Sequence, residues 1–309
     1  MVKGRHLLGL SDYSRAEVDL ILARSAEIKA EGKSGRSRQS LAGKNVAMIF
    51  EKASTRTRVS FQVGIAQLGG HAVFLPDREL QMTRGEPIRD TARVISRYVD
   101  AVVIRARKHA DVVEFASWSQ VPVINGLTDL LHPCQLLADI FTLQEQGLDL
   151  DRIKVAFIGD GNNLANSWLE TAIHYHFELT LACPPGYDPD PEILRAARER
   201  EANVKIVRDP QAAAQGADVL YTDVWVSMGQ EAEKEKRLAD FAGFQINRDL
   251  VKIAAPAVKV MHCLPAHRDQ EITDEVIESR HSIIFDEAEN RLHAQKAVLE
   301  LIIGDLSHG

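Results

Sequence analysis

Two short runs of this chain carry residue types that could do chemistry. The first, residues 54–58, combines two arginines with three hydroxyl side chains at the start of a helical pattern. A helix N-terminus offers free N–H groups and partial positive charge, and an arginine can hold two oxygens of one anion. A capped surface helix with solvated arginines would show the same run. Arg105 favours an anion site, because it ends an apolar strand pattern, where ligands collect in open α/β sheets.

The second run, residues 261–267, places a lone thiol, Cys263, directly after an apolar stretch. Most free cysteines are small buried hydrophobes, so a packing role stays open beside a functional one. A metal cluster of His262, Cys263 and His267 is disfavoured, because Pro265 lies between them and no fourth ligand is evident. We predict no metal site.

Two further runs lie between these, at residues 132–135 and 223–229. Pro133 suits the first position of a helix, and His132 and Gln135 are three residues apart, so both can project from its start. A histidine can donate to a developing oxyanion, and a glutamine can accept from an amide NH2. A packed histidine, or a carboxylate that caps a loop at Asp223, would show the same patterns.

The composition excludes several protein classes. The chain has 309 residues, 45% hydrophobic and 26% charged, enough for two ordinary globular domains. Its net charge of -7 argues against nucleic-acid binding, so an anion site must be local. Three irregularly spaced cysteines indicate neither a disulfide framework nor a zinc finger. Without a signal-peptide or membrane-span pattern, we predict a cytoplasmic protein with no membrane partner.

Short apolar β-branched runs alternate with longer helical patterns. This alternation predicts an α/β fold with two doubly wound domains and mainly parallel sheets, joined by long helices. We predict a first domain over residues 1–135, a second over 136–289, and a final helix, residues 290–309, that packs back on the first. The predicted strands are 45–50, 72–75, 101–105, 121–124, 154–159, 179–182, 204–207, 219–222, 258–261 and 283–285.

The run at residues 155–163 looks at first like a dinucleotide-binding loop after a strand. However, Leu164 stands where the third glycine belongs, and the next strand ends at Ala182-Cys183 rather than at an acid for a ribose. A dehydrogenase is therefore disfavoured. Asn163 is better interpreted as a substrate ligand at a strand end.

Taken together, the four runs resemble the aspartate/ornithine carbamoyltransferase family over about residues 50–291. The Ser-Thr-Arg-Thr-Arg and His-Pro-x-Gln patterns are shared across that family, whereas Asp-x-x-x-Ser-Met-Gly and His-Cys-Leu-Pro are similar to its ornithine branch. The resemblance implies carbamoyl transfer from carbamoyl phosphate to the δ-amine of L-ornithine, without a cofactor. It also implies a site between two domains, in a homo-oligomer that is a trimer or a multiple of trimers with shared active sites.

The resemblance implies roles for individual residues. The residues implied to act in catalysis are Arg105, His132, Asp223 and Cys263. Those implied to bind carbamoyl phosphate are Ser54, Thr55, Arg56, Thr57, Gln81, Arg105, His132, Gln135, Cys263, Leu264 and Arg291, with Gln81 reaching across the subunit boundary. Those implied to hold ornithine are Asn163, Asp223, Ser227 and Met228.

Three alternatives stay open. An aspartate carbamoyltransferase would share the first two patterns but should lack the run from Asp223 and the thiol of Cys263. A putrescine carbamoyltransferase would not need the Ser227-Met228 dock for an α-carboxylate. A non-catalytic homologue that binds ligand would have no reason to keep the whole set of polar residues.

Overall fold

The computed structural model describes residues 2–36, 38–226 and 231–305. The chain divides into two compact units, one of Met1–Phe141 with Glu289–Gly309 and one of Thr142–Ala288. Each unit contains a parallel sheet with helices beside it, which confirms the predicted α/β class. The substrate that each predicted domain binds stays a prediction. Among the described helices, none combines the length and apolar character that crossing a membrane requires.

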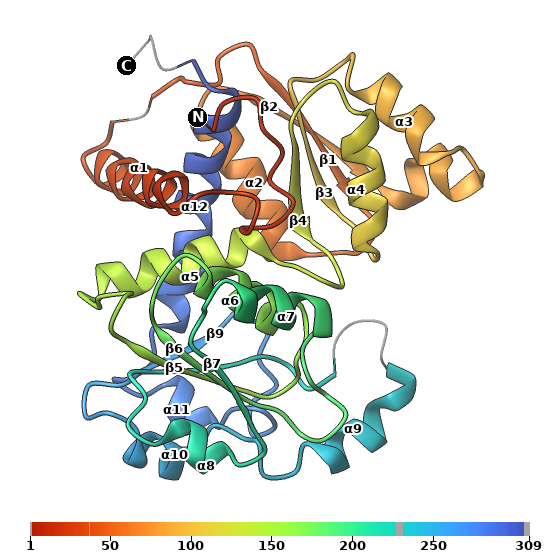
Figure 1. Cartoon of the computed structure of the whole chain (residues 1–309). Helices are drawn as coiled ribbons and strands as arrows, with labels where there is room; N and C mark the ends of the chain where they lie inside the picture. Colours follow the sequence, from red (N-terminus) through yellow and green to blue (C-terminus); the bar gives the residue numbers. More distant parts are fainter. Residues whose placement is uncertain (1, 37, 227–230, 306–309) are drawn as a thin grey trace. The chain divides into compact units, whose positions relative to one another are not determined.

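The sheet of the first unit has four parallel strands in the order β2-β1-β3-β4. Successive strand residues point to opposite faces. Ala47, Ile49 and Val102 therefore share a face and pack with Phe115 of helix α4. Figure 1 shows α3 and α4 on one side of this sheet and α2 on the other. The elements are α1 Arg15–Lys33, β1 Asn45–Phe50, α2 Thr55–Gln67, β2 His71–Pro76, η1 Asp77–Glu79, η2 Gln81–Arg84, α3 Ile88–Ile95, β3 Ala101–Arg105, α4 His109–Trp118 and β4 Val123–Leu127.

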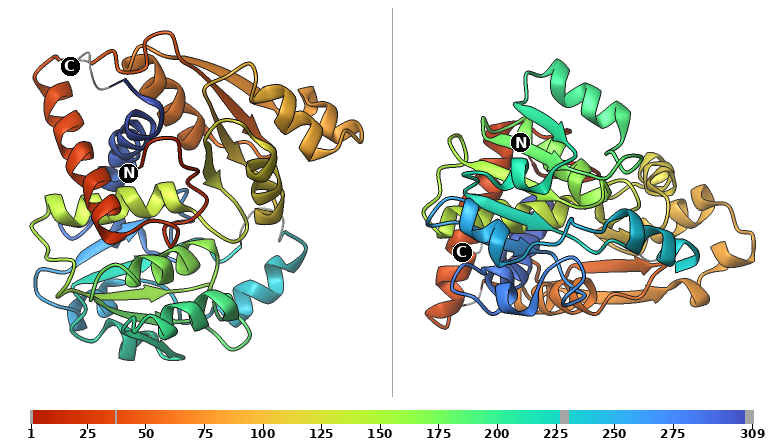
Figure 2. Two further views of the ribbon diagram at one scale, coloured as in Figure 1. Left: turned by 45° about the horizontal axis from the view of Figure 1, so that its top comes forward. Right: turned by 90° about the horizontal axis from the view of Figure 1, so that it is seen from below.

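The sheet of the second unit has five parallel strands in the order β7-β6-β5-β8-β9. On one face Trp168 of α6 packs edge-on against Tyr221, with ring centroids 5.6 Å apart. On the other, Phe241 and Leu250 belong to a continuous buried cluster. Figures 1 and 2 show helices on both faces. The elements are β5 Lys154–Ile158, α6 Asn163–Ala172, β6 Glu178–Ala182, α7 Pro191–Glu199, β7 Val204–Val207, α8 Pro210–Ala214, β8 Val219–Thr222, η3 Glu231–Glu233, α9 Lys234–Asp240, α10 Arg248–Ile253, β9 Lys259–His262 and α11 Asp274–Ile277.

Two long helices, α5 (Pro133–Glu145) and α12 (Ile284–Ile303), carry the chain from one unit to the other. The predicted strand at residues 283–285 is wrong, because α12 already begins there. Ser282 makes a single bridge to Val260, and the acidic Asp286 and Glu287 then suit the first turn of a helix. The other predicted strands are confirmed to within three residues at each end.

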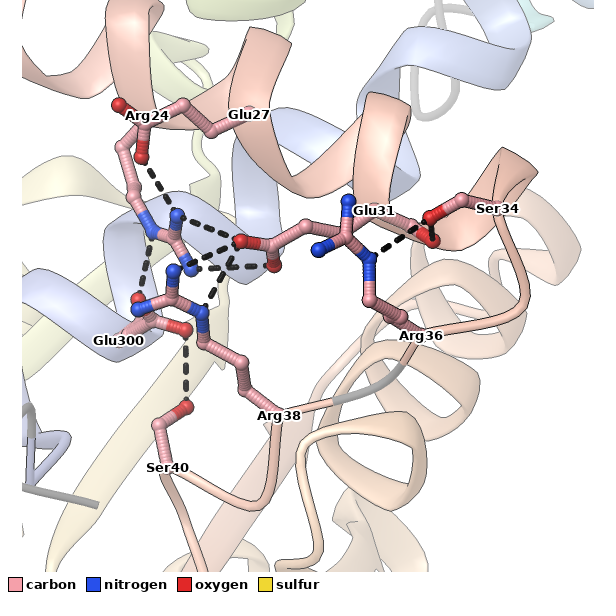
Figure 3. A network of polar contacts seen from close by, with 8 residues as sticks. All are labelled: Arg24, Glu27, Glu31, Ser34, Arg36, Arg38, Ser40 and Glu300. Carbon is pink, nitrogen blue, oxygen red and sulfur yellow. Dashed lines mark hydrogen bonds and ion pairs between the residues drawn. The ribbon is translucent and has the colours of Figure 1, made fainter. Parts of the chain in front are cut away.

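Helix α1 is fixed to α12 by buried charges (Figure 3; the left view of Figure 2 shows both helices). Arg24 donates through Nε to Glu300 at 2.6 Å, and Ser40 donates to the other oxygen of Glu300 at 2.9 Å. Lys29 donates to Asn290 at 2.8 Å, closer to the start of α12. Since Glu300 is 1% exposed, its charge depends on these donors.

Arg24→Met should lower the free energy of unfolding by about 3–5 kcal/mol, because it leaves the Glu300 charge buried without its cation. That corresponds to a melting temperature lower by at least roughly 6 °C in a thermal scan. Arg38→Met is the matched control: its side chain is 40% exposed in its pair with Glu31, so it should change stability by less than about 1 kcal/mol. Equal effects of the two substitutions would contradict the special role of the buried pair.

Candidate active site

The anion-binding run lies where β1 ends and α2 begins. Ser54 caps α2, and its hydroxyl accepts the N–H of Thr57 at 3.3 Å, as the sequence predicts. The helix ends at Gln67, with Gly69 in the left-handed region just beyond it. The first turn of α2 therefore presents backbone N–H groups and hydroxyls at the carboxyl edge of the sheet, which is a suitable place for a phosphate.

Two buried cations meet at one hydroxyl in this place. Arg291 of α12 donates to Thr57 Oγ1 at 2.7 Å, and Arg105, the last residue of β3, donates to the same atom at 3.5 Å. All three residues are at most 5% exposed. These two positive charges and the helix N-terminus together favour a nearby anion. The arrangement is therefore complementary to a multiply charged anion.

Arg56 adds a third cation in the first turn of α2. It is half-buried, and among the described residues its Nε, which is buried, has no hydrogen-bond partner. Thr55 beside it is exposed. Gln81 lies exposed on η2, and its predicted role in a neighbouring subunit stays a prediction.

His132 and Gln135 open α5 and are both buried. Burial, with the nearby charges of Arg291 and Arg105, lowers the pKa of His132 well below its usual value, so the ring is neutral near pH 7. A neutral imidazole offers one N–H donor. Gln135 donates from Nε2 to Asp139 at 2.8 Å, which fixes the direction of its amide and leaves the oxygen as the acceptor end.

In the second unit, three polar side chains meet where neighbouring strands end. Asp223 follows β8, is 6% exposed and accepts from Asn162 Nδ2 at 2.7 Å. Its other oxygen lies 3.1 Å from Cys263 Sγ, directly after β9. Since β5, β8 and β9 are adjacent, the carboxyl ends of the strands bring these side chains together. The arrangement suits recognition of an ammonium group. Leu264 follows with a φ of 58°, the left-handed region.

Asn162 is a residue that the sequence analysis missed. Its Oδ1 caps α6 by accepting the N–H groups of Leu164 and Ala165, and this cap directs Nδ2 to Asp223. An asparagine just before an apolar helical pattern is the signal that could have revealed it. The predicted ligand Asn163 is the next residue, the first of α6, and is half-buried.

The chain beyond Asp223 is anchored by a buried ion pair. Arg237 of α9 pairs with Asp160 and donates to the carbonyl of Trp225 at 2.6 Å. Burial raises the pKa of Asp160 to about 6, against the opposing effect of Arg237. The predicted ligands Ser227 and Met228 lie outside the described residues, so their roles stay predictions.

The depressed pKa of His132 predicts a pH dependence of stability. Unfolding restores its ordinary pKa of about 6.5, so the unfolded chain binds more protons than the folded one as the pH falls below that value. The contribution of the neutral ring is therefore complete above about pH 6.5 and is lost toward acid, by at most about 1.4 kcal/mol per pH unit.

In His132→Gln the free energy of unfolding should decrease less between pH 7 and pH 5 than in the wild-type protein. His176→Gln, at an exposed histidine, is the control and should leave the slope unchanged. A wild-type slope retained in the His132 variant would show that this ring does not titrate as described.

Comparisons with known proteins identify relatives of this chain. Residues 5–145 match the family model of the aspartate/ornithine carbamoyltransferase carbamoyl-P binding domain, and residues 151–302 match that of the Asp/Orn binding domain. An ornithine carbamoyltransferase of Syntrophotalea carbinolica is 52% identical over 299 residues, which cover 97% of this chain and 99% of the relative. One from Archaeoglobus fulgidus is 52% identical over 300 residues, covering 97% and 98%.

Solved structures give the same result. The ornithine carbamoyltransferase from Pyrococcus furiosus superposes with a TM-score of 0.94 at 50% identity and covers 98% of each chain. The models of one family thus cover both halves of this chain. The chain belongs to the aspartate/ornithine carbamoyltransferase family.

Proposed function

We propose that this protein transfers the carbamoyl group of carbamoyl phosphate to the δ-amine of L-ornithine, giving L-citrulline and phosphate. The observation that carries the proposal is the convergence of Arg105 and Arg291 on Thr57 at the start of α2. Thr57 and Arg105 lie in the part of the chain that matches the carbamoyl-P binding model, and Arg291 comes from the part that matches the Asp/Orn binding model. Relatives at about 50% identity that bear the name ornithine carbamoyltransferase support the choice of amine.

The chemistry needs no covalent enzyme intermediate, because carbamoyl phosphate is already activated. The δ-nitrogen attacks the carbamoyl carbon, the C–N bond forms, and the C–O bond to phosphate breaks. An alkylammonium has a pKa of about 10.4, so presenting the free amine at pH 7 costs about 4–5 kcal/mol. Desolvation beside the apolar Leu264 reduces that cost. The departing phosphate takes up the proton that the attacking nitrogen loses.

The first unit supplies the groups for carbamoyl phosphate in this proposal. Arg105 and neutral His132 donate to the carbamoyl oxygen as it becomes an oxyanion, a contribution commonly worth about 100-fold in rate. Gln135 accepts from the carbamoyl NH2. The phosphate is bound by Ser54, Thr55, Arg56, Thr57 and Arg291, with Gln81 added from a neighbouring subunit.

The second unit supplies the groups for ornithine. The buried carboxylate of Asp223, between Asn162 and Cys263, orients the α-ammonium. Asn163 holds the same substrate, and Ser227 and Met228 dock its α-carboxylate. Cys263 and Leu264 lie where the amino acid and the carbamoyl group meet, and Cys263 acts there as a ligand rather than as a nucleophile.

We also propose a trimer, or a multiple of trimers, working in the cytoplasm. The exposed position of Gln81 on η2 supports a role outside its own subunit. Among the described residues, Cys134, Cys183 and Cys263 form no disulfide, as is usual in a reducing compartment.

A citrulline assay with variants of each substrate site tests the proposal. Arg56→Ala should weaken carbamoyl phosphate binding roughly 100-fold, because about two charge-assisted hydrogen bonds are lost. Asp223→Asn should weaken ornithine about 10–100-fold and leave carbamoyl phosphate binding nearly unchanged. Calorimetry and initial rates separate the two effects.

Arg58→Ala is the matched control in the same run, because this guanidinium stacks on the ring of Phe74 at 3.7 Å and should not affect the anion. Aspartate and putrescine belong in the same assay. Turnover of either in place of ornithine would identify another amine, and ligand binding without turnover would leave a non-catalytic homologue.

Mixing two inactive variants tests the shared site. Arg56→Ala and Gln81→Ala chains, dissociated and reassembled together, should recover a substantial fraction of activity, since some sites then receive an intact Gln81 beside an intact Arg56. Each variant reassembled alone is the control. No recovery in mixed assemblies of verified composition would place Gln81 in its own subunit's site, and a Gln81→Ala chain that is fully active alone would place it outside any site.

A further inference from the structure

The side chain of His262, at the end of β9, is wholly buried, and both of its ring nitrogens are engaged. Nδ1 lies 2.9 Å from the backbone N–H of Leu264, and Nε2 lies 3.1 Å from Glu271 Oε1. A backbone N–H can only donate, so Nδ1 must be the acceptor. The ring is therefore neutral, with its proton on Nε2 and directed to Glu271.

Leu264, which donates its backbone N–H to this ring, has an unusual backbone conformation. Leu264 adopts a φ of 58°, a left-handed conformation that residues with side chains avoid unless their surroundings impose it. The hydrogen bond from Leu264 N–H to the ring two residues earlier is a local interaction that favours this bend. The bend directly follows Cys263, whose sulfur contacts Asp223 at 3.1 Å.

Glu271 supports the same segment at its other end. Its Oε1 also accepts the backbone N–H of His267 at 2.6 Å. The backbone N–H of His262 is fixed in turn, because it donates to Glu287 Oε2 at 3.0 Å, while Tyr221 donates to Oε1 of that carboxylate at 3.1 Å. Residues 263–267 are thus held at both ends by buried groups that do not need to touch a substrate.

A metal-binding role for this ring does not fit the hydrogen bonds. Ligand-type atoms of Asp223, His262 and Cys263 lie within 4.8 Å of one another. A histidine binds a metal through a nitrogen lone pair. In His262 the lone pair of Nδ1 is directed to Leu264, and Nε2 carries the proton.

We infer that His262 is a positioning residue for the reaction: fixed as its Nε2–H tautomer by Glu271, it holds Leu264 in the left-handed conformation and so sets Cys263 and the Leu264 backbone toward the substrates. This inference rests on the proposed function. It assigns Glu271 a supporting role, because the glutamate selects the tautomer.

Two substitutions of His262 test the hydrogen bonds of its two ring nitrogens separately. In His262→Asn the side-chain oxygen lies near the place of Nδ1 and can still accept from Leu264. In His262→Gln the amide lies near the place of Nε2 and can satisfy only Glu271. The Asn variant should keep kcat/KM for ornithine within about 10-fold of wild type, and the Gln variant should lose about 100-fold, as expected for a reacting group misplaced by roughly 1 Å.

Both variants should still bind carbamoyl phosphate in calorimetry, because most of its proposed ligands lie in the first unit, and a general loss of folding would abolish this binding. His267→Asn is the control in the same segment, because its half-exposed ring is replaced while its backbone N–H to Glu271 is kept. It should behave as wild type. Nitrogen NMR of histidine-labelled wild-type enzyme should report an unprotonated Nδ1 at His262.

Equal losses in the two variants, or a more active Gln variant, would overturn the inference, as would a protonated Nδ1 even if neither variant folds. An inactive wild-type protein is a different result, because it would refute the proposed function.

Discussion

The anion-binding cluster depends on one small hydroxyl, that of Thr57. Guanidinium groups that come from β3 and from α12, far apart in sequence, donate to it. Both groups are cationic, and the N-terminus of α2 adds to the positive potential. Helix α12, which carries Arg291, is tied to α1 through Arg24 and Glu300. An anion with several negative oxygens is what such a cluster binds best.

The second unit uses the same architectural principle with the opposite charge. Asn162, Asp223 and Cys263 follow the carboxyl ends of three neighbouring strands, and the aspartate accepts hydrogen bonds from the other two side chains. A carboxylate paired in this way keeps its charge available for an ammonium ligand. The chain after Cys263 is shaped by buried hydrogen bonds around His262 and Glu271. Each unit thus presents side chains at the carboxyl edge of a parallel sheet, the place where ligands bind in such folds.

The sequence predicted the fold class, nearly all strands and the cap at Ser54, because these depend on local patterns that can be counted. It failed at residues 283–285, where an apolar run of strand type instead opens a helix with acidic residues in its first turn. It also missed Asn162 and the pairing of Arg237 with Asp160. Such contacts join residues more than 60 positions apart, so their chemistry becomes visible only once the sheet order brings strand ends together.

The most direct test of the proposed anion site is a crystal structure of this protein with a bisubstrate mimic, a phosphonate joined through an amide to the δ-nitrogen of ornithine. The phosphonate should bind at the start of α2, on Arg56, Thr57 and Arg291, with the α-amino group on Asp223. A phosphonate bound away from Thr57, with Arg105 and Arg291 still directed to that hydroxyl, would contradict this assignment.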